Sequence, residues 1–324
     1  MENKSTKLLL GILIPNIVSL LIVGASKYLV EYLKGGYYAP DGSWIGNQGG
    51  YSDYSGIFIF SDFIIVPVLM GIISAFYWRA LGWKTKEYLL WSSLNTLVAI
   101  ILSAVFLKEG VICLLIISPL VWTFVVAGAF AGKFMFRRKN NTLNASVVGI
   151  LLLLFAGDLF SKHEYENMDS DTMVINAPVE KVWQYVVEYE PIKADEKYWL
   201  FKAGMPSPVQ STVDGHCEGA GRKCIFSNGY TFDEKMIVYK PNRDLTFDIV
   251  KQPRDPEIMG HIDILRGQFI LKDNGDGTTA LIGNSWYKLY VFPVWYFDIW
   301  SESITRNVHL RVMEHIKILA EKDV

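Results

Sequence analysis

Apolar residues occur in long runs up to about residue 160, and shorter alternating segments follow to the end of the chain. A helix needs about 20 mainly apolar residues to cross a bilayer. Five runs reach or approach that length, and they cover residues 8–30, 57–77, 88–107, 111–136 and 143–160. The pattern therefore predicts a membrane region over 1–164 with about five transmembrane helices.

The first run allows two interpretations. Lys4 and Lys7 precede it, and Gly24-Ala25-Ser26 is the kind of small-residue sequence at which a signal peptide is cleaved. The run is long for the apolar part of a signal peptide, and this length favours a helix that is retained. The cleaved form stays open as the alternative.

Basic residues in the connecting segments indicate the orientation in the membrane. Segments 78–87 and 137–139 are positively charged, whereas segment 31–56 is rich in Gly, Tyr and Asp. Positive segments stay on the cytoplasmic side, so the N-terminus is expected there. Five crossings place the C-terminal domain outside, and so do four that begin outside after cleavage. We expect a multi-pass integral protein of the plasma (inner) membrane with an extracytoplasmic C-terminal domain, a placement that depends on the short fifth run.

Two carboxylates, Asp62 and Asp158, fall inside the predicted membrane helices. An acid within a membrane is a candidate functional group because burying its charge is costly. Both lie near the outer ends of their helices, where water and lipid headgroups reach. Solvation at the interface, or a hydrogen bond between helices, explains them better than an ion path, which needs more acids than the runs contain.

Beyond residue 164 the pattern predicts one soluble domain, 165–324. A short strand at 173–175 precedes a helix that opens at Pro178, and a second short helix is expected at 195–201. Gly, Pro, Asn and Asp then separate short apolar segments, which is typical of antiparallel strands. The strands are expected near residues 210–216, 222–228, 231–240, 244–251, 260–272 and 278–290.

The chain ends in a long amphipathic helix that opens at Pro293 and runs to about Lys322. Its apolar positions step by three, four or seven residues, as a single buried face requires. These positions are Phe297, Ile304, Val308, Val312, Ile316 and Leu319. An antiparallel sheet can bury such a face by wrapping around the helix, which predicts an α+β architecture.

The segment that opens the soluble domain also carries a resemblance. A strand, then Asn-Ala-Pro-Val-Glu-Lys-Val-Trp over 176–183, then a helix, resembles the start of the START-like (SRPBCC) superfamily. Within it, the polyketide cyclase/dehydrase and lipid-transport-like proteins are the most similar branch, over roughly residues 171–322. The resemblance implies a helix-grip fold, with a ligand cavity between a curved sheet and the C-terminal helix. The membrane helices are no part of that superfamily's pattern.

Composition narrows the functional classes. The formal net charge is −2, so charge gives no strong argument for nucleic-acid binding, and we expect no such partner. Hydrophobic residues make up 51% of the chain and the mean hydropathy is +0.23, which fits a membrane-associated protein. No phosphate-binding glycine loop is present, and we expect no cofactor.

Three cysteines exclude a dense disulfide scaffold, but two of them are close together. A two-residue turn at Ala220-Gly221 would place Cys217 directly opposite Cys224, where β-carbons are near enough for a disulfide. An extracytoplasmic domain would allow the oxidation. Two reduced cysteines are the alternative. No second ligand pair has zinc-site spacing, so no metal is expected.

Aromatic residues supply the candidate ligand-binding positions, because small-molecule sites are mostly apolar with a few polar groups. Alternation along 278–290 puts Trp286 and Tyr290 on one face, which we expect to line the pocket with the first turns of the last helix. The candidate ligand-binding residues are Trp199, Phe226, Tyr230, His261, Trp286, Tyr290, Phe297 and Trp300.

Two functions remain in competition. The first is a membrane-tethered binding module that holds a hydrophobic small molecule or lipid between sheet and helix. The second is a START-like enzyme, a cyclase or hydrolase, which would need a convergent acid and base. No histidine stands in an arrangement that identifies such a pair from the sequence, so no catalytic residue is assigned and binding is the preferred interpretation.

Overall fold

The computed structural model describes residues 4–33, 36–38, 44–46, 58–136, 145–158, 160, 164–253 and 261–322. The chain forms two compact units. The helical unit comprises Met1–His163 with Pro256–Ile258 and Tyr290–Pro293, and the sheet unit comprises Glu164–Asp255, Met259–Leu289 and Val294–Val324. Most of the predicted 31–56 segment and the whole 137–139 basic segment lie outside the described residues.

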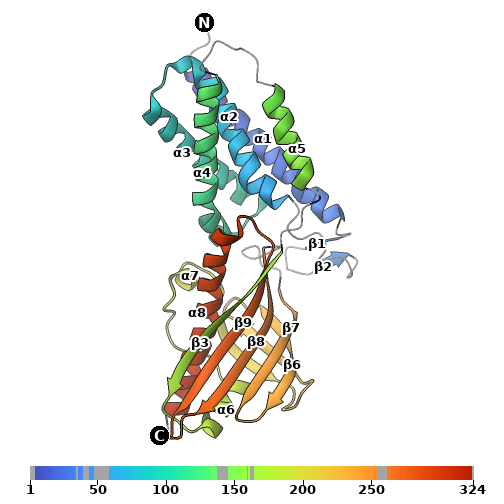
Figure 1. The fold of residues 1–324 in the computed structure, drawn as a ribbon, viewed down its shortest axis with the longest axis vertical. Helices are drawn as coiled ribbons and strands as arrows, with labels where there is room; N and C mark the ends of the chain where they lie inside the picture. Colours follow the sequence, from blue (N-terminus) through green and yellow to red (C-terminus); the bar gives the residue numbers. More distant parts are fainter. Residues whose placement is uncertain are drawn as a thin grey trace. The chain divides into compact units, whose positions relative to one another are not determined.

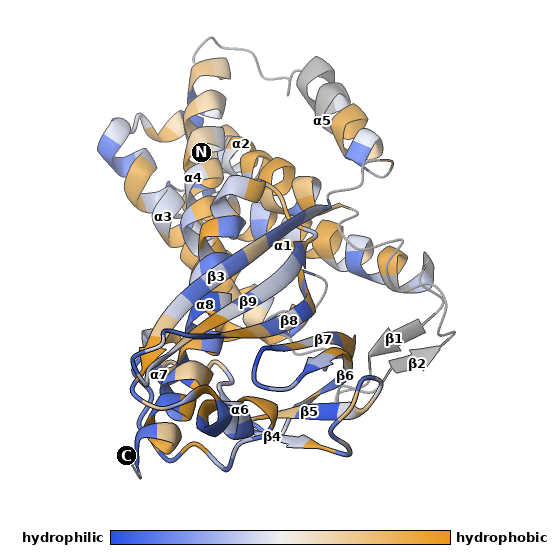
Figure 2. Ribbon diagram, turned by 60° about the horizontal axis from the view of Figure 1, so that its bottom comes forward, coloured by the Kyte–Doolittle hydropathy of each residue, from blue (hydrophilic) through white to orange (hydrophobic). Residues whose placement is uncertain are grey.

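The helical unit contains five α-helices among its described residues (Figure 1). They are α1 (Lys4–Leu33), α2 (Val66–Trp78), α3 (Thr85–Leu102), α4 (Val111–Met135) and α5 (Ala145–Asp158). The π-helical turns η1 (Ser61–Ile65) and η3 (Ser103–Leu107) and the 3₁₀ turn η2 (Arg79–Leu81) extend them, and β1 (Gly36–Tyr38) pairs with β2 (Trp44–Gly46). Orange, the colour of hydrophobic residues in Figure 2, recurs along the described parts of these helices.

Four helices in the described part of the chain are long and apolar enough to cross a membrane: Lys4–Val30, Ser61–Leu81, Thr85–Leu107 and Val111–Met135. They match the first four predicted spans. The fifth predicted span, 143–160, corresponds to α5, which has 14 residues. This is shorter than the roughly 20 residues that a crossing takes, so the number of crossings depends on α5.

Helices α2 and α4 pack closely through small residues. A β-carbon added at Gly71 would lie 2.1 Å from the carbonyl oxygen of Val125, and one added at Gly128 would lie 2.1 Å from that of Val68. Glycine at these contacts lets the two backbones meet, as is common where helices associate in a membrane.

Buried polar side chains also join the helices. Asn16 of α1 donates to Asn95 of α3 at 2.5 Å, and Asn95 donates to the hydroxyl of Ser74 in α2 at 2.8 Å. The backbone N–H of Ser61 donates to a carboxylate oxygen of Asp158 at 2.7 Å, which matches the predicted hydrogen bond between helices. Such bonds satisfy groups that would be costly to leave unpaired in an apolar surrounding.

The sheet unit has a seven-stranded antiparallel sheet in the order β3-β9-β8-β7-β6-β5-β4 (Figure 1). The strands are β3 (Tyr165–Ile175), β4 (Pro208–Val213), β5 (Gly221–Phe226), β6 (Thr231–Lys240), β7 (Asp244–Lys251), β8 (Ile262–Asp273) and β9 (Thr279–Leu289). Six of them match predicted strands to within a few residues. The exception is β3, which begins eight residues before the predicted 173–175.

Three helices complete the sheet unit: α6 (Val179–Val187), α7 (Trp199–Lys202) and α8 (Val294–Glu321). The curled sheet wraps along α8, so the predicted helix-grip arrangement is confirmed as a fold (Figure 1). The apolar core joins the inner face of the sheet to α6 and to the second half of α8. From α8 the buried members of this core are Val312, Met313, Ile316 and Ala320.

The first half of α8 differs from the prediction. Phe297, Ile304 and Val308 were expected to form its buried face, but all three are only partly buried. The side chains that are buried there are polar, and they lie four residues apart: Ser301, Thr305 and His309. The helix is therefore turned so that its first half presents polar groups to the sheet, whereas its second half presents mainly apolar ones, with His315 as a buried polar side chain.

Candidate functional site

Polar side chains of β3 and β9 face the first half of α8. Asn167 and Asp171 of β3 both reach that helix through hydrogen bonds. Ser285 and Tyr287 of β9 do the same. Because side chains alternate along a strand, residues 167, 169 and 171 share one face of β3, and 285 and 287 share that face of β9. We call this group of residues, with the helix residues that they meet, the α8 polar cluster.

His309 lies at the centre of one hydrogen-bonded series. Its Nε2 is 2.7 Å from Oδ2 of Asp171, and its Nδ1 is 3.2 Å from the hydroxyl oxygen of Ser285. Arg306, one turn earlier, pairs with the other oxygen of Asp171 at 3.0 Å. Burial lowers the pKa of His309, although the hydrogen bond to Asp171 opposes this effect.

The lowered pKa fixes the roles in this series. At neutral pH the imidazole of His309 is uncharged, so only one ring nitrogen carries a proton. The carboxylate of Asp171 accepts that proton's hydrogen bond from Nε2. The Nδ1 atom is then an acceptor for the hydroxyl of Ser285. An orienting acid, a neutral imidazole and a hydroxyl thus follow one another, as general-base activation of a hydroxyl requires.

Asp298, near the start of α8, is the centre of a second hydrogen-bonded series in the cluster. The hydroxyl of Tyr287 donates to it at 2.7 Å, and the amide of Asn167 donates to both carboxylate oxygens at 3.2 and 3.3 Å. Burial, followed by the hydrogen bond to Asp298, raises the pKa of Tyr287. Tyr287 therefore stays protonated and acts as a hydrogen-bond donor.

Asp169 lies between these two series on β3. It is directly opposite Ser285 in the register of the two strands, and 8% of its surface is exposed. Its Oδ2 atom has no hydrogen-bond partner among the described residues. Burial, then the charges of Glu302, Asp171 and Asp298, raise its pKa to about 7.

A separate buried ion pair lies farther along the sheet. Arg222 of β5 pairs with Glu234 of β6, and both side chains are almost fully buried. The guanidinium also donates to the carbonyl oxygen of Val187 at 3.2 Å and lies 4.5 Å from the centre of the Phe247 ring. This pair is thus satisfied within the core of the sheet unit.

The predicted aromatic positions are spread over the sheet unit rather than gathered at one place. Among the helices of the sheet unit, Trp199 of α7 packs edge to face against Trp300 of α8, with ring centres 6.3 Å apart. Phe297 of α8 is partly buried. Phe226, at the end of β5, packs on Phe232 of β6 at 4.8 Å. Phe226 follows Arg222 and Cys224 on the same, inward side of its strand.

The other predicted positions do not join these rings. Trp286 alternates with Ser285 and Tyr287, both of which face α8, so its ring lies on the opposite face of the sheet. Its expected place in a wall between sheet and helix is corrected. Tyr290 follows β9 in a segment that belongs to the helical unit. Tyr230 lies in the turn between β5 and β6, and His261 directly precedes β8.

The predicted hairpin geometry of the two cysteines is also corrected. Cys217 lies in the loop between β4 and β5, and the residues opposite Cys224 are Ser211 and Phe232. Both cysteines are free thiols, one exposed and one buried. Burial raises the pKa of Cys224 to about 12, and the hydroxyl of Tyr189 lies 4.0 Å from its sulfur.

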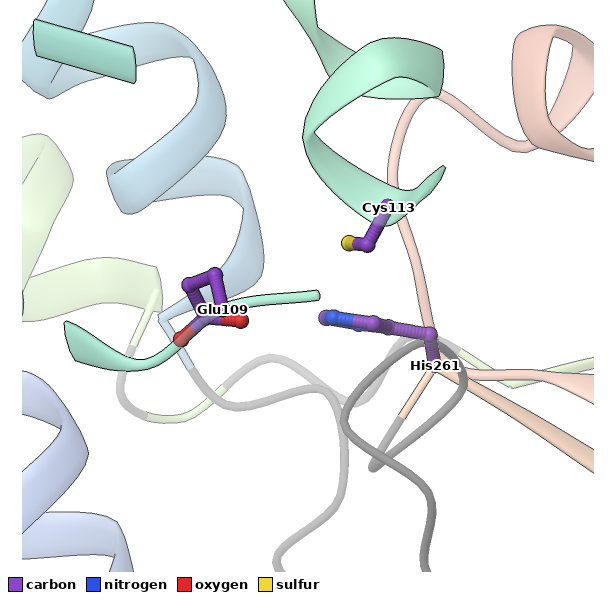
Figure 3. A group of neighbouring side chains, drawn as sticks. All are labelled: Glu109, Cys113 and His261. Carbon is purple, nitrogen blue, oxygen red and sulfur yellow. The ribbon is translucent and has the colours of Figure 1, made fainter. Parts of the chain in front are cut away.

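Figure 3 shows the one group of three potential metal ligands among the described residues: Glu109, Cys113 and His261. Glu109 and Cys113 belong to the helical unit, whereas His261 belongs to the sheet unit. The positions of the two units relative to one another are not determined, so we assign no metal to this group.

Comparison with known proteins adds little beyond these observations. No family model and no curated protein matches the sequence. Truncated norcoclaurine synthase from Thalictrum flavum is a structural neighbour with 10% identity and a TM-score of 0.36, covering 51% of this chain and 99% of its own. Zhui aromatase/cyclase from Streptomyces sp. R1128 has 12% identity and a TM-score of 0.34, covering 49% and 95%.

A protein from Nitrosospira multiformis gives similar values, with 16% identity, a TM-score of 0.33 and coverage of 48% of this chain and 98% of its own. Identities and TM-scores as low as these carry no argument about function. We therefore infer function from the chain's own residues.

The α8 polar cluster was missed in the sequence for a specific reason. Residues 167, 169 and 171 precede the strand predicted at 173–175, so their alternation was not recognised. Polar residues at 298, 301, 305 and 309 recur at helical spacing, but the apolar positions of the same helix also recur and predict a different buried face. A polar period in a strand together with a polar period in a helix is the signal that could have indicated the cluster.

Proposed function

We propose that this protein is a membrane-anchored binding module whose sheet unit holds a mainly apolar small molecule or lipid between the sheet and the first half of α8. One observation carries the proposal. The apolar core of the sheet unit takes its α8 residues from Val312 onward, and polar groups occupy the same side of α8 before that point. A ligand site needs such groups to orient a molecule whose remaining contacts are apolar.

Aromatic rings on α7, on α8 and on the inward side of the sheet support an apolar wall for that ligand. Trp300 and Phe297 lie on the first half of α8 and are partly buried, and Trp199 adds a ring beside Trp300. Phe226 and Phe232 contribute rings on the inward side of the sheet. The cavity implied by the START-like resemblance stays a prediction, and these residues are its proposed wall.

Ligand binding is tested with 4-phenylbutanol, an apolar probe that dissolves in water. Equilibrium dialysis would measure its binding to the full-length chain in lipid nanodiscs, with empty nanodiscs as the blank for partitioning. Thr305→Trp places a large ring on the side of α8 that faces the sheet and should reduce binding. Ile318→Trp is the matched control, because Ile318 is exposed on the same helix. Wild-type binding no greater than the blank would contradict the proposal.

The membrane helices serve as the anchor in this proposal. We place the chain in the plasma (inner) membrane with its N-terminus in the cytoplasm and the sheet unit outside, which requires α5 to complete a fifth crossing. Cys217 is a natural reporter because it is exposed, whereas Cys224 is buried. Cys113 is partly exposed, so the experiment uses a Cys113→Ser background. A membrane-impermeant maleimide should label this variant in intact cells, and adding Cys217→Ser should abolish the label. Labelling only after lysis would place the sheet unit inside.

The Ser285–His309–Asp171 series favours a second candidate, a hydrolase that uses Ser285 as nucleophile. His309 would accept the hydroxyl proton, and Asp171 would stabilise the resulting imidazolium. Hydrolysis of p-nitrophenyl butyrate tests this role. Ser285→Ala should abolish the activity. Ser303→Ala is the control and should not, because Ser303 is hydrogen-bonded to Tyr198 instead. Equal rates for wild type and Ser285→Ala would contradict the hydrolase role, and the binding-module proposal would be unaffected.

A further inference from the structure

Asp169 stands out among the buried acids of the sheet unit because its Oδ2 atom has no hydrogen-bond partner in the described part of the chain. Its neighbours two residues away on β3 both have partners on α8: Asn167 bonds to Asp298 and Asp171 bonds to His309. Asp169 lies between them on the same face, so its carboxyl points toward the same side of the helix. A buried carboxyl oxygen without a partner loses free energy that a bound donor would restore.

The groups that face Asp169 from each neighbouring element are mostly acidic. From β3 comes Asp171, and from α8 come Asp298, Glu302 and Arg306 as charges that act on its pKa. His309 of α8 is uncharged at neutral pH, and β9 contributes Ser285 and the neutral Tyr287. The positive charge of Arg306 is already engaged with Asp171. The surroundings of Asp169 therefore carry an excess of negative charge.

Two kinds of cation could occupy such a place, a metal ion or an organic ammonium group. A metal ion needs three or more ligand atoms close together. In the described part of the chain, the acids and the histidine of the α8 polar cluster include no three whose ligand atoms all lie within 4.8 Å of one another. An ammonium group needs one carboxylate and a few polar neighbours, which this arrangement offers.

We propose that the ligand of the sheet unit carries a protonated amine, and that the amine pairs with Asp169 while the apolar part of the ligand lies against the aromatic rings. The proposal rests on the proposed function and names its ligand class, a cationic amphiphile. The hydroxyl of Thr305 already donates a hydrogen bond to the carbonyl of Ser301 in its own helix. Asp169 is thus the principal partner that the cluster provides for a cation.

The pairing should depend on pH in one direction. Asp169 must be ionised to bind a cation, and its pKa is raised to about 7. Protons compete with the amine below that value, whereas an alkylamine stays protonated up to about pH 10. Amine affinity should therefore rise between pH 6 and pH 8, and the affinity of an uncharged analogue should not.

The experiment compares three probes with the same apolar body: 4-phenylbutylamine, 4-phenylbutanol and 4-phenylbutanoate. Equilibrium dialysis with the full-length chain in nanodiscs of zwitterionic lipid measures each affinity at pH 6 and pH 8. At pH 8 the amine should bind about 10- to 100-fold more tightly than the alcohol, the range expected for a hydrogen bond to a charged group. The butanoate should bind most weakly.

Two variants identify the residue. Asp169→Asn should remove the preference for the amine and its pH dependence, with little change for the alcohol. Asp248→Asn is the matched control, because Asp248 is a partly exposed acid paired with Arg266, and it should change neither. Equal binding of amine and alcohol, or an amine preference that survives in Asp169→Asn, would overturn the inference and leave the binding module intact. Failure of every probe to exceed the blank would instead overturn the proposed function as well.

Discussion

From Val312 onward α8 presents mainly apolar side chains to the sheet unit, and the buried polar exception, His315, bonds to the carbonyl of Glu190. Its preceding turns present Ser301, Thr305 and His309. Both halves of the helix are buried against the same sheet. In the second half the contact is non-directional, and it stabilises the fold in proportion to the apolar area removed from water. In the first half each buried polar group costs free energy unless a partner satisfies it.

The two halves of α8 therefore differ in role: the second mainly stabilises the fold, and the first mainly supplies polar groups. The second half holds the sheet unit together through the core that contains Met313 and Ile316. The first half contributes hydrogen bonds whose partners are separated by more than a hundred residues, such as His309 and Asp171. It also leaves Asp169 unsatisfied, which a region devoted to stability alone would avoid. The four predictions below test this division by measuring the stability of the sheet unit.

The largest effect is expected at the buried ion pair between Arg222 and Glu234. Arg222→Met removes one partner and leaves the carboxyl of Glu234 buried and unpaired, which should lower the free energy of unfolding by about 3–5 kcal/mol. The double variant Arg222→Met with Glu234→Leu should recover most of the loss. Hydrogen exchange of β6 amides in the full-length chain measures both. A double variant as unstable as the single one would argue against an electrostatic cause.

Core truncation should come next in size. Met313 is fully buried in the second half of α8. Met313→Ala removes apolar contacts and leaves a cavity, so the free energy of unfolding should fall by about 2–5 kcal/mol. The same exchange measurement applies. Ile318→Ala, at an exposed position of the same helix, serves as control and should change stability by less than about 1 kcal/mol.

Substitution of Asp169 should raise the free energy of unfolding, whereas the two preceding changes lower it. Its pKa is about 7 in the folded chain and 3.8 ordinarily, so the folded state keeps a proton that the unfolded state releases as pH rises from about 4 to 7. The free energy of unfolding of the wild type therefore decreases as the pH rises through that interval. Asp169→Asn should stabilise the sheet unit at pH 8 by roughly 2 kcal/mol and have little effect near pH 4.

A stabilisation of Asp169→Asn that is equal at both pH values would show that the carboxyl does not titrate in this interval. Asp248→Asn again provides the control. It removes an acid that lies on the sheet beside Arg266, and its effect at pH 8 should be smaller than that of Asp169→Asn because a surface ion pair contributes at most about 1 kcal/mol.

The smallest effect is expected for Ser301→Ala. Ser301 is buried on the sheet-facing side of the first half of α8. Alanine keeps the backbone carbonyl that Thr305 uses, and its higher helix propensity offsets the lost hydroxyl. Stability should change by less than about 0.5 kcal/mol in the exchange experiment. A loss as large as that of Met313→Ala would remove the distinction between the two halves.

Much of the fold was predictable because local patterns specify it. Turn residues such as Asn274 to Gly277 separate β8 from β9, and the strands on either side begin and end within two residues of the prediction. Apolar runs indicated the first four long helices in the same way. These signals depend on neighbours in the sequence, and the structure follows them wherever burial is apolar.

The candidate site was largely beyond such patterns. Aromatic residue type does not indicate which face of a strand a ring occupies. Trp286 lies on the face of the sheet away from α8, since Ser285 and Tyr287 occupy the other face. The cysteines were paired by assuming a tight turn, whereas the strands pair Cys224 with Ser211. In both cases the register between strands decided the outcome, and a shift of one residue exchanges the two faces.

By itself the sequence determined the four long apolar helices, the positions of six strands along the chain and the long last helix. These follow from hydrophobic period and turn chemistry, which act over a few residues. Only the tertiary structure decided which side of α8 is buried in its first half, because His309 and Asp171 meet across 138 positions. It alone decided that Asp169 is enclosed among other acids, since the environment of a polar group depends on distant segments that no local period records.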